Sequence, residues 1–335
     1  MAIGRFSVIP VDDARPLEPL FPSSSSNKDT FSSSSSSLDG FIYKRTLGEG
    51  GYGKVYLASY GSKVFAIKVA QKRFSGKPTD EFLTLSKANH PFIVKLHHHH
   101  IGLQKEYFVL EFCGGGDMRT LLSRVSFFQE SQAAFYGSEI LSALTYLHTS
   151  LSTAFRDLKP SNILVDARGH IKLTDFGLSL PLSRKKALAR LSGTTEYMSP
   201  EAFISEGPPH HVKEDIWAFG VLLYELLLGK RPFDGPSKSA TITNILKLNY
   251  DLSSLNGGLS HQAKAVLSDI FVMEADRIES ANDVFAHSFF DAYRLSPNEL
   301  SSLSAPFDPM LRSKDDLSHF ELSSFEDDDK RILCQ

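Results

Sequence analysis

The chain contains Asp157-Leu158-Lys159-Pro160-Ser161-Asn162 and, shortly after it, Asp175-Phe176-Gly177. Together these two stretches supply two carboxylates, one amide and one ammonium group. A phosphoryl group in transfer, together with its metal ions, carries concentrated charge, so catalysis of that reaction depends on positioning and charge neutralisation. The four groups therefore indicate phosphoryl transfer from ATP.

The same four groups match a known template for phosphoryl-transfer enzymes, and their roles are assigned from that match. By the match, Asp157 accepts a hydroxyl proton and Lys159 faces the transferring group. Asn162 and Asp175 hold the metal ion, Mg²⁺ or Mn²⁺.

A glycine-rich stretch, Gly48-Glu49-Gly50-Gly51-Tyr52-Gly53-Lys54-Val55, fits the pattern G-x-G-x-x-G-x-V. Glycines let the backbone approach phosphates closely. The pattern also fits a dinucleotide-binding turn, but that turn needs a strand before it and a helix after it. Because the residues after Val55 alternate like a strand, the dinucleotide interpretation fails. A glycine-rich hairpin without a ligand remains the alternative.

Three further positions suit a nucleotide. Lys68, in Ala66-Ile67-Lys68, is placed to grip the α- and β-phosphates, and Glu81 is placed to pair with it. The alternative is a surface lysine and a solvated glutamate. Leu110-Glu111-Phe112-Cys113 is an extended, apolar-flanked stretch that suits adenine. Asp117 reaches the ribose or a basic substrate side chain, or caps a helix that begins at Met118.

The order of predicted elements changes from strands to helices along the chain. Residues 1–40 are rich in Ser and Pro and are predicted to be disordered. Two β-type runs flank Gly61-Ser62 and predict a hairpin with a primed turn. Other predictions are a helix over 79–88, strands over 92–96 and 106–112, a helix over 133–147 capped by Ser131, and a buried helix over 216–228. His97 to His100 are interpreted as solvated surface, because they alternate on a strand and no cysteine is near to complete a zinc site.

Composition excludes several classes of protein. The chain has 335 residues, with 36 Lys and Arg against 39 Asp and Glu, a balance that argues against a nucleic-acid binder. Cys113 and Cys334 are the two cysteines, which is typical of a reducing compartment. The longest apolar run is too short and interrupted to span a membrane, and the N-terminus has no secretory signal. We expect a soluble cytoplasmic monomer, with nuclear access left open.

At this point the chain resembles a eukaryotic protein kinase over residues 41–290. Ser199-Pro200-Glu201 resembles the Ala-Pro-Glu motif, Asp215-Ile216-Trp217-Ala218-Phe219-Gly220 resembles Asp-x-Trp-x-x-Gly, and Arg277 fits the arginine that pairs with Glu201. The resemblance implies an α+β bilobal fold with a small β-rich N-lobe and a larger helical C-lobe. Residues 1–40 precede this domain, and residues 291–335 resemble an AGC-type C-terminal tail.

The subgroup resembles AGC kinases. His90-Pro91-Phe92-Ile93-Val94-Lys95-Leu96 and Gly193-Thr194-Thr195-Glu196-Tyr197 are close to that group's motifs. Pro306-Phe307-Asp308-Pro309 and Ser318-His319-Phe320-Glu321 resemble the tail that wraps the small lobe, with Phe320 near the nucleotide. The family's nucleotide site maps onto Leu47, Gly48, Gly50, Gly53, Val55, Ala66, Lys68, Leu110, Glu111, Cys113, Asp117 and Leu164.

The chain departs from the family pattern at several positions. Phe155 replaces the usual His or Tyr and is expected to stack with Phe176, Leu85 and Leu96. Ser161 stands where basophilic members carry Glu, Thr195 replaces Pro, and a terminal Phe-x-x-Phe motif is not evident. None of these departures removes a catalytic group.

The activation segment also departs from the pattern. Arg156 is of a type that needs an anion from this segment, commonly a phosphate. The usual acceptor position is Arg190, which cannot be phosphorylated, and Arg184, Lys185 and Lys186 add positive charge. Our hypothesis is that phosphorylated Ser192, or the acidic stretch Glu326 to Asp329, supplies the anion, with Thr195 a second acceptor.

The resemblance therefore predicts a serine/threonine kinase that uses MgATP and phosphorylates protein substrates. Lys159 and Thr194 would help to place the substrate hydroxyl, and Asp117 and Glu225 would favour basic residues upstream of it. An upstream activating kinase is an expected partner. The alternative is a pseudokinase that binds ATP as a scaffold, which would be expected to lack Lys68, Asp157 or Asp175.

Overall fold

The computed structural model describes residues 38, 40–50, 53–71, 78–184, 193–204, 210–252 and 258–320. The predicted disorder of residues 1–40 therefore falls almost wholly outside the described residues. The chain divides into two compact units. The first is built from the described residues between 38 and 71 and from 95–112, and the second from 78–94 and the described residues between 113 and 320.

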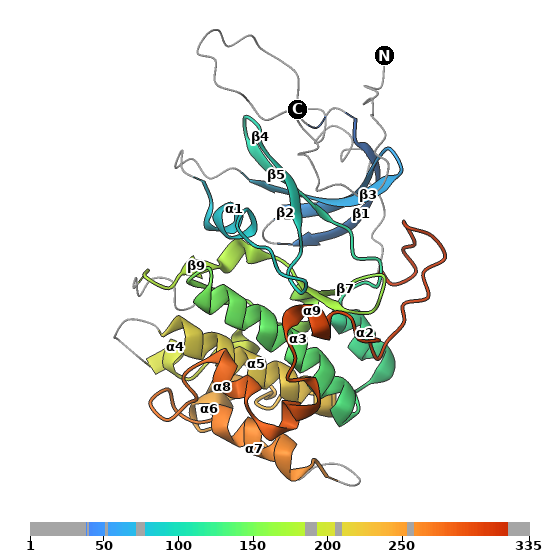
Figure 1. Cartoon of the computed structure of the whole chain (residues 1–335). Coiled ribbons are helices and arrows are strands. Elements are labelled where there is room, and N and C mark those ends of the chain that lie inside the picture. The colour runs from blue at the N-terminus through green and yellow to red at the C-terminus, as the bar shows by residue number, and fades with distance from the viewer. Residues whose placement is uncertain are drawn as a thin grey trace. The chain divides into compact units, whose positions relative to one another are not determined.

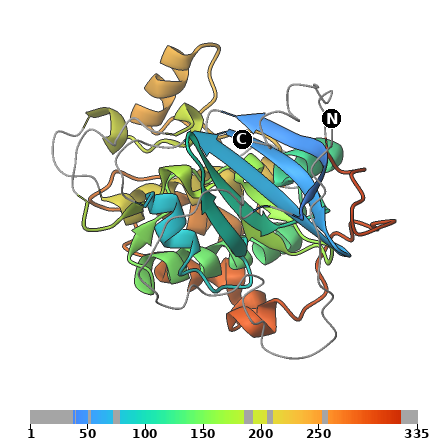
Figure 2. The ribbon, with the colours of Figure 1, turned by 90° about the horizontal axis from the view of Figure 1, so that it is seen from above.

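The first unit is an antiparallel sheet. Within the described residues it has five strands in the order β1-β2-β3-β5-β4, side by side in Figures 1 and 2. The strands are β1 (Ile42–Gly50), β2 (Gly53–Tyr60), β3 (Lys63–Gln71), β4 (Leu96–Ile101) and β5 (Lys105–Glu111). Every neighbouring pair is antiparallel.

The predicted hairpin is confirmed. Strands β2 and β3 pair up to Tyr60 opposite Lys63, so Gly61-Ser62 forms a two-residue turn. Gly61 has φ of +61° and Ser62 does not have a positive φ, as a primed turn with glycine first requires. Gly53, at the other end of β2, has φ of +131°, and a Cβ there would lie 2.1 Å from the carbonyl oxygen of Val69. Glycine is therefore the residue that fits at Gly53.

The register of the sheet places the predicted nucleotide-contacting residues on one face. Val55 lies opposite Lys68, and Ala66 lies opposite Leu110. Directly opposed residues share a face, and so do residues two apart along a strand. The other face carries the hydrophobic core of this unit, made of Leu38, Phe41, Tyr56, Ala58, Phe65, Ile67, Val69, Tyr107 and Val109.

The interpretation of His97 to His100 as solvated surface is wrong. All four histidines lie within β4 and are partly buried. The His97 ring packs edge-on against Phe65, with 5.2 Å between ring centroids. The His99 side chain is only 9% exposed, and its Nε2 lies 2.8 Å from Glu106 Oε1. These side chains therefore pack and form hydrogen bonds within the sheet, which the alternation of side chains along a strand did not predict.

The second unit is mainly helical. Its helices in the described residues are α1 (Asp80–Leu85), α2 (Met118–Val125), α3 (Glu130–Thr149), α4 (Glu201–Ile204), α5 (His211–Leu228), α6 (Lys238–Leu246), α7 (His261–Ile270), α8 (Ala281–Phe285) and α9 (Pro297–Leu300). Two short antiparallel pairs join β6 (Thr153–Ala154) to β9 (Leu180–Pro181) and β7 (Ile163–Val165) to β8 (Ile171–Leu173). The fold is thus α+β, as predicted.

The long apolar run forms the buried helix that was predicted. It lies in α5, where Trp217 is fully buried and stacks on Phe233 with 5.2 Å between ring centroids. Helix α5 ends at Leu228, and Gly229 adopts the left-handed conformation that commonly terminates helices. No helix among the described residues has the length and apolar character needed to cross a bilayer.

Three predicted element boundaries are wrong. Helix α1 ends at Leu85 instead of Ala88, because Ser86 to Ala88 form a turn whose amides bond to Phe82 and Thr84. Helix α3 begins at Glu130, and its N-cap is Gln129, whose amide donates to Gln132 Oε1, so Ser131 is not the cap.

The third wrong boundary is the strand predicted over 92–96. The backbone of Phe92 and Val94 bonds to Leu173 of β8, at 2.9 Å in each case. Because these amides and carbonyls already have partners in the helical unit, β4 begins only at Leu96.

The described part of the C-terminal tail is attached to the helical unit. The Arg124 guanidinium donates to His319 Nδ1 at 2.7 Å, and His170 donates through Nε2 to the carbonyl of Leu303 at 3.1 Å. The prediction that the tail wraps the small lobe, with Phe320 near the nucleotide, concerns the other unit and stays a prediction. The acidic stretch at 326–329 lies outside the described residues.

Candidate active site

A buried carboxylate holds the loop that carries the candidate catalytic residues. Asp215 of α5 is fully buried and accepts backbone hydrogen bonds from Phe155 at 2.8 Å and Arg156 at 2.7 Å. It also lies 2.8 Å from His148 Nε2 of α3. Arg156 has φ of +70°, an unfavourable conformation for a non-glycine residue. The two hydrogen bonds from Asp215 stabilise this bend, which turns the chain toward Asp157.

Asp157 is the centre of a small polar cluster. Its side chain is 3% exposed, and Lys159 Nζ donates to its Oδ2 at 2.8 Å. Lys159 Nζ also donates to Thr194 Oγ1 at 3.1 Å. The structure therefore brings together three residues that the sequence assigned to placing and activating a substrate hydroxyl.

Asn162, in the 3-10 helix η1 (Pro160–Asn162), completes this cluster. Its Nδ2 donates both to the backbone oxygen and to Oδ2 of Asp157, each at 2.8 Å. Because both partners are acceptors, the amide nitrogen must face Asp157, which leaves Oδ1 as the remaining polar atom. Oxygen is the ligand that Mg²⁺ requires. The orientation of Asn162 therefore fits the metal-holding role predicted for it.

Asp175 lies at the end of the second motif. Asp175 has φ of +61° and precedes the 3-10 helix η2 (Phe176–Leu178). The backbone joins the two motifs, because the amide of Thr174 donates to the carbonyl of Asn162 at 3.0 Å. A strained left-handed aspartate is common at functional sites, where the surrounding structure imposes the conformation.

Phe155 and Phe176 pack as predicted. Their rings lie edge to face with 5.0 Å between centroids, and both side chains are fully buried. This contact connects the loop before Asp157 to the segment after Asp175. Phe155 therefore supports the site through apolar packing at a position where the family that the chain resembles usually has His or Tyr. Leu85 is buried in the same unit, whereas Leu96 belongs to the other unit, so its part in the stack stays a prediction.

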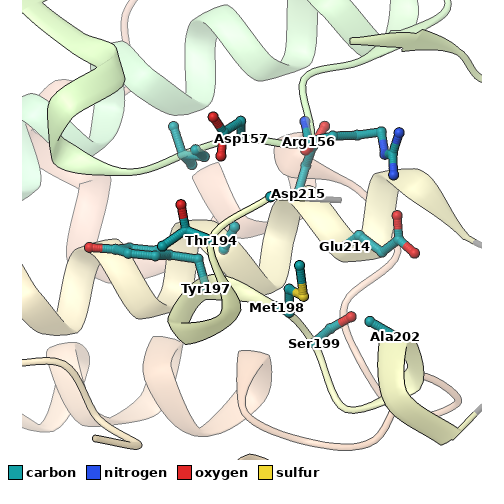
Figure 3. Close-up of a pocket in the computed structure, with 12 residues that line it drawn as sticks. Arg156, Asp157, Thr194, Tyr197, Met198, Ser199, Ala202, Glu214 and Asp215 are labelled. Atoms are coloured by element: carbon teal, nitrogen blue, oxygen red, sulfur yellow. The ribbon is translucent and has the colours of Figure 1, made fainter. Parts of the chain in front are cut away.

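A pocket lies beside Asp157 (Figure 3). Its walls come from the loop around Asp157, from residues 193–202 and from the first turns of α5. Figure 3 shows Thr194 below Asp157, and the Arg156 guanidinium on the same side as the Glu214 carboxylate. The pocket presents an acidic group and a hydroxyl side chain to whatever occupies it.

A buried ion pair anchors the segment that forms the wall of this pocket. Arg277 donates through Nη1 to Glu201 Oε1 at 2.5 Å and through Nη2 to Oε2 at 3.1 Å. The Arg277 guanidinium also lies over the Trp217 ring, 4.7 Å from its centroid. The predicted pairing of Arg277 with Glu201 is confirmed.

The predicted nucleotide-binding residues are distributed over both units. Leu47, Gly48, Gly50, Gly53, Val55, Ala66, Lys68, Leu110 and Glu111 belong to the sheet, and Glu81, Cys113, Asp117 and Leu164 belong to the helical unit. Lys68 and Glu81 are both buried. Because they are in different units, their pairing stays a prediction. Asp117 does cap α2, accepting from the amide of Thr120 at 2.7 Å, and this capping does not exclude a ligand role.

Two contacts that shape the site were not predicted from the sequence. His148 was not singled out, although it contacts Asp215, and Asp215 was noted only as part of a buried-helix motif. The second contact joins Tyr197 to α5, where its phenol donates to Glu225 Oε2. Burial raises the pKa of Tyr197, and the neighbouring Glu225 carboxylate adds to that effect, so the phenol stays protonated. A buried tyrosine hydroxyl needs a partner, and that requirement was the available signal.

Comparison of the sequence with known proteins indicates the same family as the motifs at this site. The sequence model of the protein kinase domain matches residues 41–290. Ribosomal protein S6 kinase 2 beta of Xenopus laevis is 36% identical over 298 residues, which cover 84% of this chain and 46% of that protein. Ribosomal protein S6 kinase alpha-3 of Homo sapiens is 37% identical over 298 residues, covering 84% of this chain and 39% of that protein.

A third relative is similar over more of its own length. Serine/threonine-protein kinase Sgk1 of Danio rerio is 33% identical over 320 residues, which cover 92% of this chain and 73% of that protein. The chain belongs to the protein kinase domain family. Its similarity to the S6 kinases and to Sgk1 agrees with the AGC resemblance of its motifs. The chain spans less than half the length of the S6 kinases it matches.

Proposed function

We propose that this chain is a serine/threonine protein kinase that transfers the γ-phosphate of ATP to hydroxyl groups of protein substrates. The observation that carries the proposal is the hydrogen-bonded cluster of Asp157, Lys159 and Thr194. A carboxylate beside a hydroxyl-bearing side chain is placed to orient a substrate hydroxyl and to accept its proton. The lysine adds positive charge where the transferred phosphoryl group is negative.

ATP and Mg²⁺ (or Mn²⁺) are the proposed co-substrate and metal ion. Asn162 Oδ1 and the Asp175 carboxylate are the proposed metal ligands, and the metal would neutralise charge on the transferring phosphate. The sheet face that carries Val55, Ala66 and Lys68 is the proposed nucleotide surface.

The alternative function is a scaffold that binds ATP without transferring phosphate. Lys68, Asp157 and Asp175 are all present, which favours the enzyme. Two measurements separate the alternatives: a thermal shift on adding MgATP reports nucleotide binding, and transfer of radiolabelled phosphate to a mixed Ser/Thr peptide library reports catalysis. Binding without transfer would support the scaffold, and absence of both would contradict any nucleotide-dependent role.

Lys68→Met provides a sharper version of this test. Lys68 is 6% exposed, and its loss should remove a charge-assisted contact to the phosphates, worth about 1.5–3 kcal/mol, or roughly 10- to 100-fold in kcat/KM. Lys63→Met is the matched control, because Lys63 lies exposed on the same strand, β3. The assignment of Lys68 to the nucleotide site is wrong if both variants keep the wild-type kcat/KM for ATP.

The proposed substrates carry basic residues upstream of the phosphorylated Ser or Thr. Asp117 supports this part of the proposal: its side chain is 23% exposed, and only Oδ1 is used in capping α2. Ser161 offers no charge where many related kinases have an acid, so the expected preference is moderate.

For the cellular state, we propose a cytoplasmic monomer with access to the nucleus. Cell fractionation tests the location, and light scattering of the purified protein tests the oligomeric state.

Regulation by an upstream kinase is a further part of the proposal. Arg156 and Glu214 line one pocket, and Ser192, which we propose as the phosphate acceptor, lies outside the described residues. We expect phosphatase treatment and Ser192→Ala each to lower kcat, because Arg156 loses the anion that orders the segment. A truncation before Ser324 tests whether the acidic stretch supplies that anion instead. Full activity in all three proteins would show that neither anion is needed.

A further inference from the structure

The segment that follows Asp175-Phe176-Gly177 is fixed at its backbone within the helical unit. Its strand β9 pairs with β6, and the amide of Leu182 donates to the carbonyl of Ser152 at 2.8 Å. The amide of Arg184 then donates to the carbonyl of Pro181 at 2.9 Å, which closes a turn. Arg184 is therefore attached to a stretch whose backbone position is set by hydrogen bonds.

The Arg184 side chain forms a two-point ion pair with Asp80 of α1. Its Nη1 donates to Oδ2 at 2.5 Å, and its Nη2 donates to Oδ1 at 3.2 Å. The two side chains are 42% and 24% exposed. Most exposed ion pairs add little to stability, but a guanidinium that meets a carboxylate through two N–H groups also fixes the orientation of both residues. The pair therefore holds this segment and the first turn of α1 in one arrangement.

Arg184 is also attached to α5 through its backbone. His211, which is only 3% exposed, donates through Nε2 to the Arg184 carbonyl at 3.1 Å. The other ring nitrogen of His211, Nδ1, lies 2.8 Å from Glu214 Oε2, and this second contact fixes the orientation of the ring. Arg184 thus connects the first turn of α5, a largely buried helix, to the first turn of α1.

Helix α1 depends on contacts outside itself for its position. It has six residues, a length at which a helix gains little stability from its own hydrogen bonds. Asp80 immediately precedes Glu81, the buried carboxylate that was assigned to Lys68. Successive residues of an α-helix point about 100° apart, so Asp80 cannot take the place of Glu81. A movement of Asp80 nevertheless moves Glu81 with it, because the two residues are adjacent in the same turn.

We propose that Arg184 is a positioning residue for phosphoryl transfer, which holds Asp80 and thereby sets the position of Glu81, the proposed partner of Lys68. This inference rests on the proposed kinase function and on the proposed pairing of Lys68 with Glu81. The ion pair is made by unmodified side chains, so this connection between the activation segment and α1 needs no phosphate. It is separate from the anion proposed for Arg156.

The test is steady-state kinetics on the full chain, with the concentrations of MgATP and of a peptide substrate varied separately. We expect Arg184→Gln to lower kcat/KM for ATP by about fivefold, which is about 1 kcal/mol at about 1.4 kcal/mol per tenfold. The KM for the peptide should not change. Arg184→Lys keeps the charge without the two-point geometry and should recover part of the loss. In a Glu81→Gln background, Arg184→Gln should cause no further loss, because the residue through which it acts is already changed.

Two further variants separate positioning from a general loss of structure. Asp80→Asn should lower kcat/KM for ATP as Arg184→Gln does, and the double variant should lose no more than either single variant, because the two residues form one contact. Arg294→Gln is the matched control. It removes an arginine of similar exposure, 48%, from another Arg–Asp pair of the helical unit, and it should keep the wild-type kcat/KM.

The possible failures are distinguishable. Absence of phosphate transfer by the wild type would contradict the kinase proposal itself. If the wild type is active and Arg184→Gln keeps its kcat/KM for ATP, the positioning role of Arg184 is wrong. An equal loss from Arg184→Gln with and without Glu81→Gln would also overturn that role, because Arg184 would then act independently of Glu81.

Discussion

Asp157→Asn is expected to lower kcat for phosphate transfer by about 10²–10⁴-fold, the range associated with loss of a general base. Asparagine has nearly the same shape, so the buried position can be filled without a cavity. It cannot accept a proton, and it replaces a charged partner of Lys159 with a neutral one. The measurement is steady-state phosphorylation of a peptide with saturating MgATP, accompanied by a thermal-unfolding curve to show that the variant is folded.

Two comparisons make this result specific. Asp269→Asn removes an exposed carboxylate on α7 and should keep wild-type kcat. Binding of MgATP to Asp157→Asn should persist, because Asn162 and Asp175 are unchanged. If Asp157→Asn transfers phosphate at a rate near that of wild type, the acceptor of the hydroxyl proton is another group and the assignment is wrong.

Glu201→Gln is expected to reduce the free energy of unfolding by about 3–5 kcal/mol, the cost of removing one partner from a buried ion pair. The Arg277 side chain is fully buried, so its charge cannot be transferred to water in the folded protein. Arg277 also donates to the carbonyls of Ile270, Lys213 and Val272, which ties together α5, α7 and the following loop. Urea denaturation, compared at the transition midpoint, measures the loss.

An exposed ion pair provides the matched control for this prediction. Arg294 and Asp291 lie 2.5 Å apart with side chains 48% and 61% exposed, so Asp291→Asn should cost less than about 1 kcal/mol. The double variant Glu201→Gln with Arg277→Met should recover part of the stability, because no buried charge is then left alone. Equal losses from Glu201→Gln and Asp291→Asn would show that burial does not govern the energy of the first pair.

Much of the candidate site could be predicted because its residues are close in the sequence. Asp157, Lys159 and Asn162 lie within one short loop, and their mutual hydrogen bonds are local. The hairpin of β2 and β3 is likewise local, and the period of two along a strand places Ala66 and Lys68 on one face. Where the residues of a contact are close in the sequence, motifs and periodicity were sufficient to predict the contact.

The sequence could not place contacts that depend on distant segments. His148, Asp215 and the loop before Asp157 come from three elements, and only packing of α3 against α5 brings them together. The prediction of a strand over 92–96 was wrong for the same reason, because the backbone of Phe92 and Val94 bonds to Leu173 of β8 in the helical unit.

Short-range spacing and side-chain chemistry were sufficient to predict the α+β class, the hairpin, the buried α5 helix and the polar groups around Asp157. The pairing of buried polar groups, in contrast, depends on how distant segments pack. The partner of the Glu225 carboxylate is the phenol of Tyr197, which lies 28 residues away in the sequence. Whether a buried carboxylate is paired depends on neighbours that the local sequence pattern does not specify, and the fold places those neighbours.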